Sequence, residues 1–261
     1  MCTVLFSFKS HPEYPLILAS NRDEFHDRPT MPAAFWDERF DLLAGRDLKA
    51  CGTWLGITKT GRFATLTNFR APASMRDDAP TRGKLVSNFL LSEKSPETYF
   101  HDMRFNAHEY NGFNLLFGYV SELYYFSNKD HGFCRKVAPG LYGLSNHLFD
   151  TPWPKVERGK KLLSDVMSGG KSITAEMIFG VLADTYQPDD SLLPDTGVGP
   201  KWERILAPIF VQSPAYGTQF STVIMVDTKN RVSFTERAFQ SRPDQYTERT
   251  FEFSITDDNK T

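Results

Sequence analysis

The sequence contains little cysteine, with only Cys2, Cys51 and Cys134 in a chain of 261 residues. So sparse and odd a number excludes a disulfide framework and is typical of a reducing compartment. The chain also lacks a run of about 18 apolar residues, so we expect no stable membrane insertion. No basic segment followed by an apolar stretch and a cleavage site marks a secretory signal. We therefore expect a cytoplasmic protein.

Neither sign of charge dominates, because 30 Lys and Arg face 32 Asp and Glu, a net charge of −2. This balance excludes a broad basic surface, so we expect no nucleic-acid partner. The six histidines are scattered and none pairs with a cysteine at the spacing of a zinc site, so no metal is expected. We expect no cofactor either. Haem stays open as a ligand, since reversible binding needs only one cysteine or histidine beside an apolar groove.

Material for a large core is present, because 40% of the residues are hydrophobic and 22 are Phe. The sequence shows no internal repeat. At this length we predict one domain, residues 1–261. The sequence does not indicate an oligomeric state.

A nucleophile is available at the second position. Removal of Met1 would make Cys2 the first residue and give it both a thiol and a primary amine. An unperturbed thiol has a pKa of about 8.5 and an α-amino group one of about 7.7–8.0, so the amine can act as the base for its own side chain. The alternative interpretation is an ordinary residue at position 2.

Two apolar runs, residues 3–8 and 16–19, flank a proline-containing segment. If they pair as a hairpin, the end of the second run returns to the start of the first, and Arg22 and Asp23 meet Cys2. Arg22 would then lower the pKa of the thiol, and Asp23 would orient the amine and the arginine. Alternatively, the charged run is a solvated turn.

The rest of the chain divides into strand and helix patterns. A hairpin predicted at 53–58 and 62–67 delivers Asn68 at the end of its second strand. Residues 24–47 predict a long loop, and Cys51 and Cys134 are expected to be small buried or half-buried residues. Further loops are predicted at 69–81 and 187–200, helices at 83–93, from Ser95, at 155–167 and at 174–185, and strands at 114–119, 123–126, 141–145, 222–226, 232–235 and 250–253. Strands, then helices, then strands indicate two sheets with helices outside.

Short motifs follow one another along almost the whole chain. They are Met1-Cys2-Thr3, Ser20-Asn21-Arg22-Asp23-Glu24-Phe25, Arg28-Pro29-Thr30, Gly52-Thr53-Trp54-Leu55-Gly56, Leu66-Thr67-Asn68-Phe69-Arg70, Thr81-Arg82-Gly83-Lys84-Leu85-Val86, Tyr110-Asn111-Gly112-Phe113-Asn114-Leu115, Gly143-Leu144-Ser145-Asn146, Thr151-Pro152-Trp153-Pro154-Lys155-Val156 and Tyr216-Gly217-Thr218 with Ser221-Thr222-Val223. In this order they resemble the NRDE-domain family, whose eukaryotic members are linked to transport and Golgi organisation.

The resemblance implies an α+β fold, the four-layer αββα sandwich of the N-terminal nucleophile hydrolases. Within that superfamily the family is similar to the cysteine-type branch of penicillin V acylases and bile salt hydrolases. The implied catalytic residues are the nucleophile, an arginine–aspartate pair beside it and two asparagines that stabilise an oxyanion. At the matching positions these are Cys2, Arg22, Asp23, Asn68 and Asn146.

Three further residues, Asn21, Glu24 and Gln219, are expected to contact a ligand. Gln219 is also a departure, because the family usually has an arginine after Tyr-Gly-Thr. A glutamine still donates a hydrogen bond but carries no charge. This difference puts in doubt thiolate stabilisation, or the binding of an anionic substrate, at that end of the site.

Two functions are compatible with these residues. The first is a thiol amidohydrolase that acts on a small acyl-amide compound. The second is a non-catalytic carrier that uses the same fold to bind a hydrophobic ligand, such as haem or an acyl conjugate. The full set of site residues favours the first, and the missing arginine at Gln219 weakly favours the second.

Overall fold

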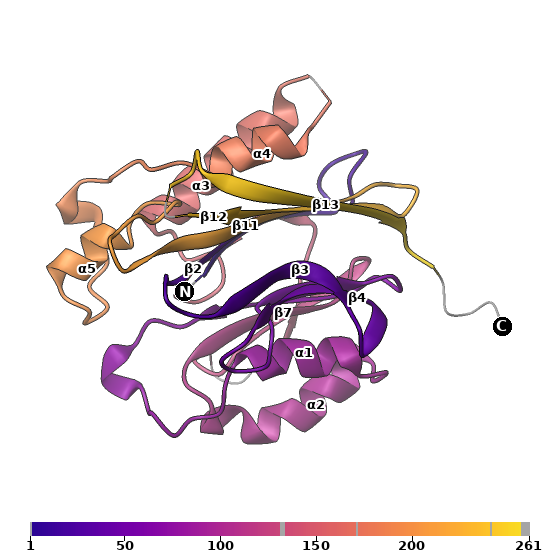
Figure 1. Ribbon diagram of the computed structural model, residues 1–261, viewed down its shortest axis with the longest axis horizontal. Helices are drawn as coiled ribbons and strands as arrows, with labels where there is room; N and C mark the ends of the chain where they lie inside the picture. The colour runs from indigo at the N-terminus through magenta and orange to yellow at the C-terminus, as the bar shows by residue number, and fades with distance from the viewer. Residues whose placement is uncertain (1, 131–133, 171, 241, 257–261) are drawn as a thin grey trace.

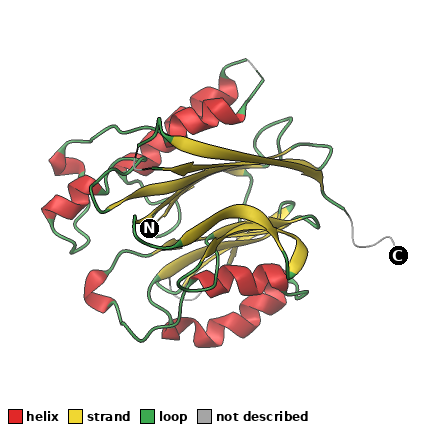
Figure 2. Ribbon diagram, in the orientation of Figure 1, coloured by secondary structure: helices red, strands yellow, loops and turns green. Residues whose placement is uncertain are grey.

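The chain folds into four layers, a helical layer, two antiparallel sheets face to face and a second helical layer (Figures 1 and 2). The computed structural model describes residues 2–130, 134–170, 172–240 and 242–256. This arrangement confirms the αββα sandwich predicted from the sequence. None of the described helices is both long and apolar enough to cross a membrane.

The first sheet combines the two ends of the chain. Its strands, in spatial order, are β10 (Gly140–Leu144), β1 (Cys2–Phe8), β2 (Leu16–Phe25), β11 (Tyr216–Val226), β12 (Arg231–Phe239) and β13 (Tyr246–Ser254). The predicted hairpin of β1 and β2 therefore lies inside this sheet. Hydrogen bonds from β10 and β11 hold it on both sides.

The second sheet is a meander in chain order. Its strands are β3 (Thr30–Trp36), β4 (Arg39–Asp47), β5 (Leu55–Thr58), β6 (Arg62–Asn68), β7 (Phe113–Tyr119), β8 (Glu122–Ser127) and β9 (Arg135–Lys136). The hairpin predicted before Asn68 is confirmed as β5 and β6.

Alternation along β1 decides which way Cys2 points. Val4, Phe6 and Phe8 pack between the two sheets, whereas Leu5 packs against the outer helices. Successive strand residues face opposite sides of a sheet, so Cys2 shares the face of Val4 and Phe6. The thiol is therefore directed at the second sheet.

Helices cover the outer face of each sheet. The apolar residues of α1 (Gly83–Leu91) and α2 (Pro96–Asn106) pack on the second sheet, and those of α3 (Pro154–Ser168) and α4 (Ala175–Leu182) on the first. The predicted start of α2 is confirmed, since Ser95 Oγ accepts a hydrogen bond from the backbone N–H of Thr98 at 3.2 Å. The remaining helical elements are η1 (Pro72–Ser74), η2 (Ala107–Glu109), η3 (Asp190–Leu192) and α5 (Pro200–Ile205).

The loop predicted over residues 24–47 is wrong, because most of it forms β3 and β4. Pro32 conceals β3 in the sequence, since proline cannot donate to a strand ladder. The strand tolerates it because β3 is the edge of its sheet and its pairing with β4 shifts register between Met31 and Ala34. Proline is common at such edges and bulges.

The prediction for Cys51 is also wrong, because its side chain is exposed, whereas Cys134 is partly buried as expected. Cys51 lies in the turn that joins β4 to Thr53, with a φ of 55°. Its N–H donates to the carbonyl of Asp47 at 2.8 Å.

Candidate active site

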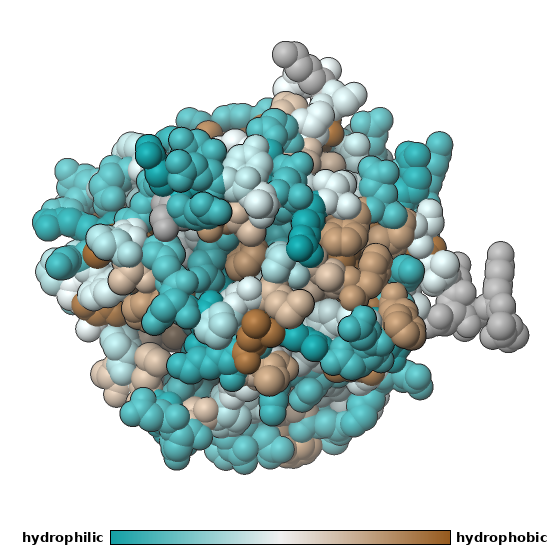
Figure 3. All heavy atoms as spheres, viewed as in Figure 1, coloured by the Kyte–Doolittle hydropathy of each residue, from teal (hydrophilic) through white to brown (hydrophobic). Residues whose placement is uncertain are grey.

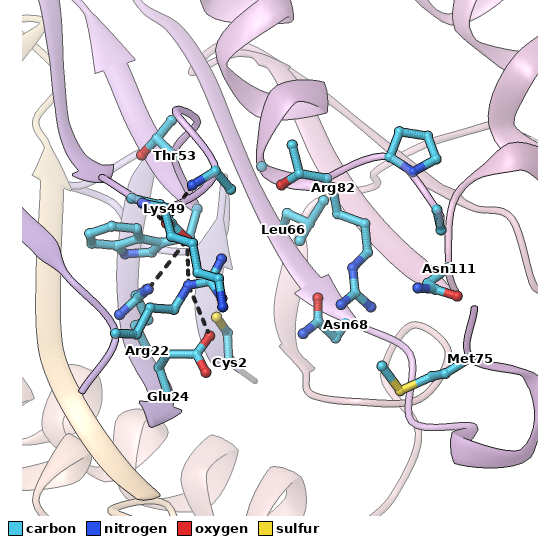
Figure 4. A pocket seen from close by; sticks show the side chains of 18 of the residues that line it. Cys2, Arg22, Glu24, Lys49, Thr53, Leu66, Asn68, Met75, Arg82 and Asn111 are labelled. Atoms are coloured by element: carbon cyan, nitrogen blue, oxygen red, sulfur yellow. Dashed lines mark hydrogen bonds and ion pairs between the residues drawn. The ribbon is translucent and has the colours of Figure 1, made fainter. Parts of the chain in front are cut away.

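The thiol of Cys2 opens onto a cavity of about 600 Å³ that lies where the two sheets and their loops meet. Figure 4 shows Cys2, Arg22, Glu24 and Lys49 on one side, with Asn68 among the residues opposite. Figure 3 shows that hydrophilic residues dominate the viewed face and that hydrophobic ones gather mainly between the sheets. The cavity is the place where predicted site residues from both sheets come together.

Pairing of β1 with β2 sets Cys2 directly opposite Arg22, as the hairpin hypothesis predicted. Cys2 is 7% exposed. Burial raises the pKa of its thiol, the charge of Asp23 raises it further, and the charge of Arg22 opposes the rise. Ionisation of this thiol therefore depends on positive charge nearby.

The guanidinium of Arg22 is held from three directions. Nη1 donates a short hydrogen bond to the side-chain carbonyl of Gln219, and Nη2 lies 3.7 Å from Asp47 Oδ2. The guanidinium carbon lies 4.5 Å from the ring centroid of Trp54, a cation–π distance. These contacts restrict the arginine beside Cys2.

Asp23 belongs to the opposite face of β2 and faces the helices as well as the rim of the cavity. Its Oδ1 accepts a hydrogen bond from Thr218 Oγ1 at 2.7 Å, and its backbone carbonyl accepts one from the Tyr216 hydroxyl at 2.8 Å. Burial raises the pKa of the Asp23 carboxyl, while the nearby charge of Lys155 lowers it. Asp23 is thus a buried group whose charge depends on its cationic neighbours.

The two predicted asparagines have different positions. Asn68 lines the cavity, and no hydrogen bond engages its side-chain amide within the described part of the chain. Asn146 is fully buried, and its Nδ2 donates to the backbone carbonyl of Asn68 at 3.0 Å. Asn68 can therefore donate into the cavity, whereas Asn146 acts on Asn68.

Of the three residues expected to contact a ligand, Glu24 alone lines the cavity. Asn21 faces the helical layer, where its Nδ2 donates to the carbonyls of Leu182 and Ile209, each at 2.9 Å. Gln219 is 8% exposed and holds Arg22 through its carbonyl. Asn21 and Gln219 support the site from behind.

Sequence reasoning missed a buried charged cluster behind Asp23. Lys155 begins the buried face of α3, and its Nζ donates to the carbonyl of Leu206 at 3.0 Å. Burial lowers the pKa of Lys155 to about 8. Beside it, Arg70 Nη1 and Glu203 Oε2 form a buried ion pair at 2.7 Å. Two sequence signals were present, a lysine on the apolar stripe of a predicted helix and the presence of Arg70 and Lys155 in the family motifs, but neither assigns them to the site.

Across the described ranges, no three His, Cys, Asp or Glu side chains are grouped so that they could hold a metal ion. The side chains that line the cavity supply a thiol, amides, guanidinium groups, a primary amine and carboxylates. Such a set suits acyl transfer, in which a nucleophile and an oxyanion donor face one substrate.

Comparisons with known proteins agree with this architecture. A model of the family described as Transport and Golgi organisation 2 matches residues 1–241. The Transport and Golgi organization protein 2 homologs of Bos taurus and Homo sapiens are 37% and 34% identical over 275 residues, which cover 98% of this chain and 99% of each relative. The C2A mutant of conjugated bile acid hydrolase from Clostridium perfringens superposes with a TM-score of 0.50 at 8% identity, over 98% of both chains.

The fold is that of the N-terminal nucleophile hydrolases, an αββα sandwich with a residue at the start of the first strand facing the space between the sheets. The likeness to the bile acid hydrolase shows this fold and nothing further about substrate. The chain belongs to the Transport and Golgi organisation 2 family, which confirms the resemblance seen in its motifs.

Proposed function

We propose that this protein is a thiol-dependent amidohydrolase that acts on a small acyl-amide compound. The observation that supports it most directly is the placement of Cys2. Its thiol faces a cavity of about 600 Å³, with Arg22 opposite it on the neighbouring strand and Asn68 in the opposing wall. A buried thiol with no chemical task would not need an open cavity in front of it.

The proposed reaction begins after removal of Met1, which lies outside the described residues. The free amine of Cys2 takes the proton of the thiol, and the thiolate attacks the carbonyl carbon of the amide to form a C–S bond. The charge that develops on the carbonyl oxygen accepts a hydrogen bond from Asn68. One such donor typically accounts for about 3 to 4 kcal/mol of the barrier.

The amine of Cys2 then returns the proton to the leaving nitrogen, and the C–N bond breaks. Water, deprotonated by the same amine, attacks the thioester, releases the acid and restores the thiol. Arg22 would raise the thiolate fraction against the effect of burial. Asp23, held by Thr218, would orient the amine.

A carrier of a hydrophobic ligand is the second candidate, and Gln219 is the observation that favours it. Its side-chain carbonyl accepts a hydrogen bond from Nη1 of Arg22, and burial keeps the pKa of the Cys2 thiol high. Both features disfavour a thiolate at Cys2. Against this, charged side chains line much of the cavity, whereas ligand sites for apolar molecules are mostly apolar. We therefore prefer the hydrolase.

The test is the intact mass of the purified protein, followed by alkylation with iodoacetamide across pH. We expect Met1 to be absent and Cys2 to react faster than Cys51, although Cys51 is the exposed thiol. A Cys2→Ser variant identifies the labelled site. Retained Met1, or a Cys2 slower than Cys51 at every pH, would exclude the self-activating nucleophile.

Titration with haem tests the carrier separately, since a saturable absorption band that Cys2→Ser abolishes would support it. Thiols remain reduced in the cytoplasm, and we propose that the enzyme acts there. Its relatives are named for transport and Golgi organisation, and we propose that hydrolysis of an acyl compound serves that process.

A further inference from the structure

Arg82 differs from the other arginines that line the cavity because, among the described residues, it is partly buried and yet forms no ion pair with a carboxylate. It lies immediately before α1 and is partly buried. Its Nη1 donates one hydrogen bond, to the backbone carbonyl of Gly112 at 3.1 Å. Within residues 2–130, 134–170, 172–240 and 242–256, no Asp or Glu forms an ion pair with it.

The two arginines on the Cys2 side are neutralised by their surroundings. Arg28 Nε lies 2.8 Å from Asp47 Oδ2, and Arg22 Nη2 lies 3.7 Å from the same oxygen. The lining as a whole has a small excess of positive charge, since it carries five cations and four anions. The cations are Arg22, Arg28, Lys49, Arg76 and Arg82, and the anions are Asp23, Glu24, Asp47 and Asp77.

Two of the remaining cations, Lys49 and Arg76, are exposed, so water solvates their charges. Arg82 is in a different position. Burial lowers the pKa of its guanidinium, and the charge of Glu24, which forms no ion pair with it, offsets this effect only in part. An anion that entered the cavity and paired with Arg82 would compensate for the solvation that the guanidinium has lost.

We propose that Arg82 binds an anionic group of the substrate, a carboxylate in the first instance, while the acyl carbonyl of the same molecule reaches Cys2. The substrate class is then an amide that carries a negative charge a few bonds from the scissile bond. This inference rests on the proposed function, since it takes Cys2 as the reacting group.

The geometry supports one molecule spanning the cavity. Figure 4 shows Arg82 on the side opposite Cys2, with Asn68 and Asn111 near its guanidinium. A guanidinium presents two parallel N–H donors that match a carboxylate. The amide of Asn68 offers an additional neutral donor on the same wall, whereas Asn111 Nδ2 already donates to the carbonyl of Arg76 at 2.9 Å. An anion at Arg82 would leave Asn68 between itself and the thiol.

The test compares two electrophiles that differ only in charge, N-chloroacetylglycine and its neutral amide, N-chloroacetylglycinamide. Both alkylate a thiol with loss of chloride, and the first carries its carboxylate a few bonds from the reacting carbon. The quantity measured is the ratio of their rates at Cys2, by intact mass and peptide mapping. The dipeptide Cys-Thr-amide supplies the reference ratio in free solution.

We expect the ratio at Cys2 to exceed the reference by tenfold or more, and to return to within threefold of it in Arg82→Gln. Arg82→Lys keeps the charge without the planar fork and should give an intermediate ratio. Arg76→Gln is the matched control, because it removes an equal charge from the exposed edge of the same cavity and should retain most of the preference. The ratio cancels any change in thiolate fraction.

A wild-type ratio equal to the reference, or an equal loss in Arg76→Gln and Arg82→Gln, would overturn the anion site. A measurement without variants guards against misfolding: N-acetylglycine should protect Cys2 of the wild-type protein from iodoacetamide at concentrations where N-acetylglycinamide does not, and equal protection would also overturn the proposal. Slow reaction with iodoacetamide alone would instead contradict the nucleophile, so the two failures are distinguishable.

Discussion

Asn146 Nδ2 donates a hydrogen bond to the backbone carbonyl of Asn68, with 3.0 Å between the two atoms. Asn68 ends β6 in the second sheet, and Asn146 follows β10 in the first. The backbone N–H of Arg70 returns a hydrogen bond to the carbonyl of Asn146 at 2.7 Å. The two sheets are therefore tied together beside the cavity, at the residue proposed to stabilise the oxyanion.

Replacement of Asn68 by alanine should slow the acylation of Cys2 much more than its alkylation. Acylation of Cys2 by p-nitrophenyl acetate passes through an oxyanion, whereas alkylation by iodoacetamide does not. We expect Asn68→Ala to slow acylation by about 100-fold or more, and alkylation by less than threefold. Release of p-nitrophenol and intact mass measure the two rates. Equal slowing of both would show that Asn68 shapes the cavity rather than stabilising the oxyanion.

Asn146 should affect the acylation rate by positioning Asn68, and it should also contribute to the free energy of unfolding. The Asn146→Asp variant keeps the Oδ1 acceptor for Arg70 Nη2, which lies 3.2 Å away, but loses the donor to Asn68. We expect it to slow acylation by a smaller factor than Asn68→Ala. Asn146→Ala loses both bonds and should lower the free energy of unfolding by about 1 to 3 kcal/mol in urea. If Asn146→Asp acylated at the wild-type rate, the tie between the sheets would have no role in positioning.

Replacing one partner of the Arg70–Glu203 ion pair should strongly lower the free energy of unfolding. Both side chains are about 5% exposed or less, with 2.7 Å between Nη1 and Oε2. Glu203→Gln leaves the guanidinium buried without its counter-charge, and we expect a loss of about 3 to 5 kcal/mol. Arg70→Met with Glu203→Leu removes both charges and should recover much of that loss. Urea unfolding measures both, and a double variant less stable than Glu203→Gln would contradict this account.

Gln219→Arg tests whether this chain tolerates the arginine that its family usually has there. The change removes the acceptor of Arg22 Nη1 and places two guanidinium groups together. We expect the free energy of unfolding to fall by about 1 to 3 kcal/mol. Gln219→Glu is the control, because it keeps the acceptor for Arg22 but loses the donor to the carbonyl of Phe25, so it should lose less stability than Gln219→Arg. A stabilising Gln219→Arg would show that the cavity wall rearranges around the second cation.

Glu236 should make the protein less stable as the pH rises. Its Oε1 accepts a hydrogen bond from the N–H of Ala33 at 2.6 Å, across the two sheets, and burial raises its pKa to about 7. Between its ordinary value of 4.5 and about 7 the folded state binds more protons at this site than the unfolded state. The free energy of unfolding must therefore fall with pH in that interval.

The size of the Glu236 effect is at most about 3 to 4 kcal/mol, at roughly 1.4 kcal/mol per pKa unit. Glu236→Gln keeps an acceptor for Ala33 and removes the titration, so its stability should be flatter between pH 4.5 and 7. Urea unfolding at several pH values gives the comparison. Parallel curves for the variant and wild type would assign the pH dependence to other groups.

The hairpin of β1 and β2 was predictable because its cause is local. Two apolar runs around a turn set the register, and the register places Cys2 opposite Arg22. Asn68 followed from a second hairpin in the same way. These predictions needed only strand periodicity and the length of a turn.

The side of the sheet to which each side chain points was harder to predict than which residues lie near one another. Asn21 and Asp23 alternate with Arg22 and Glu24, so four consecutive residues of β2 cannot all point into one cavity. The sequence motif treats the four as a unit, whereas in the structure Arg22 and Glu24 line the cavity, Asn21 faces the helical layer and Asp23 lies at the border of the two. Asn21 consequently holds α4 and the segment after α5 in place.

Lys155, Glu203 and Arg82 could not be assigned to the site from the chain alone. Each reaches the cavity or its rear wall through the packing of a helix on a sheet, which depends on contacts distant in sequence. The strands β3 and β4 were missed for a related reason, since an edge position permits the proline that hides β3. Long-range packing overrode the local signal in both cases.

The proposed nucleophile and the proposed oxyanion donor belong to different sheets, so the side chains between the sheets set their separation. Phe6 and Phe63 are among those that fill this space. A change in their volume would move one wall of the cavity relative to the other while leaving every residue of the wall in place. Family members with identical site residues could thus accept substrates of different length, according to the thickness of a core that no substrate touches.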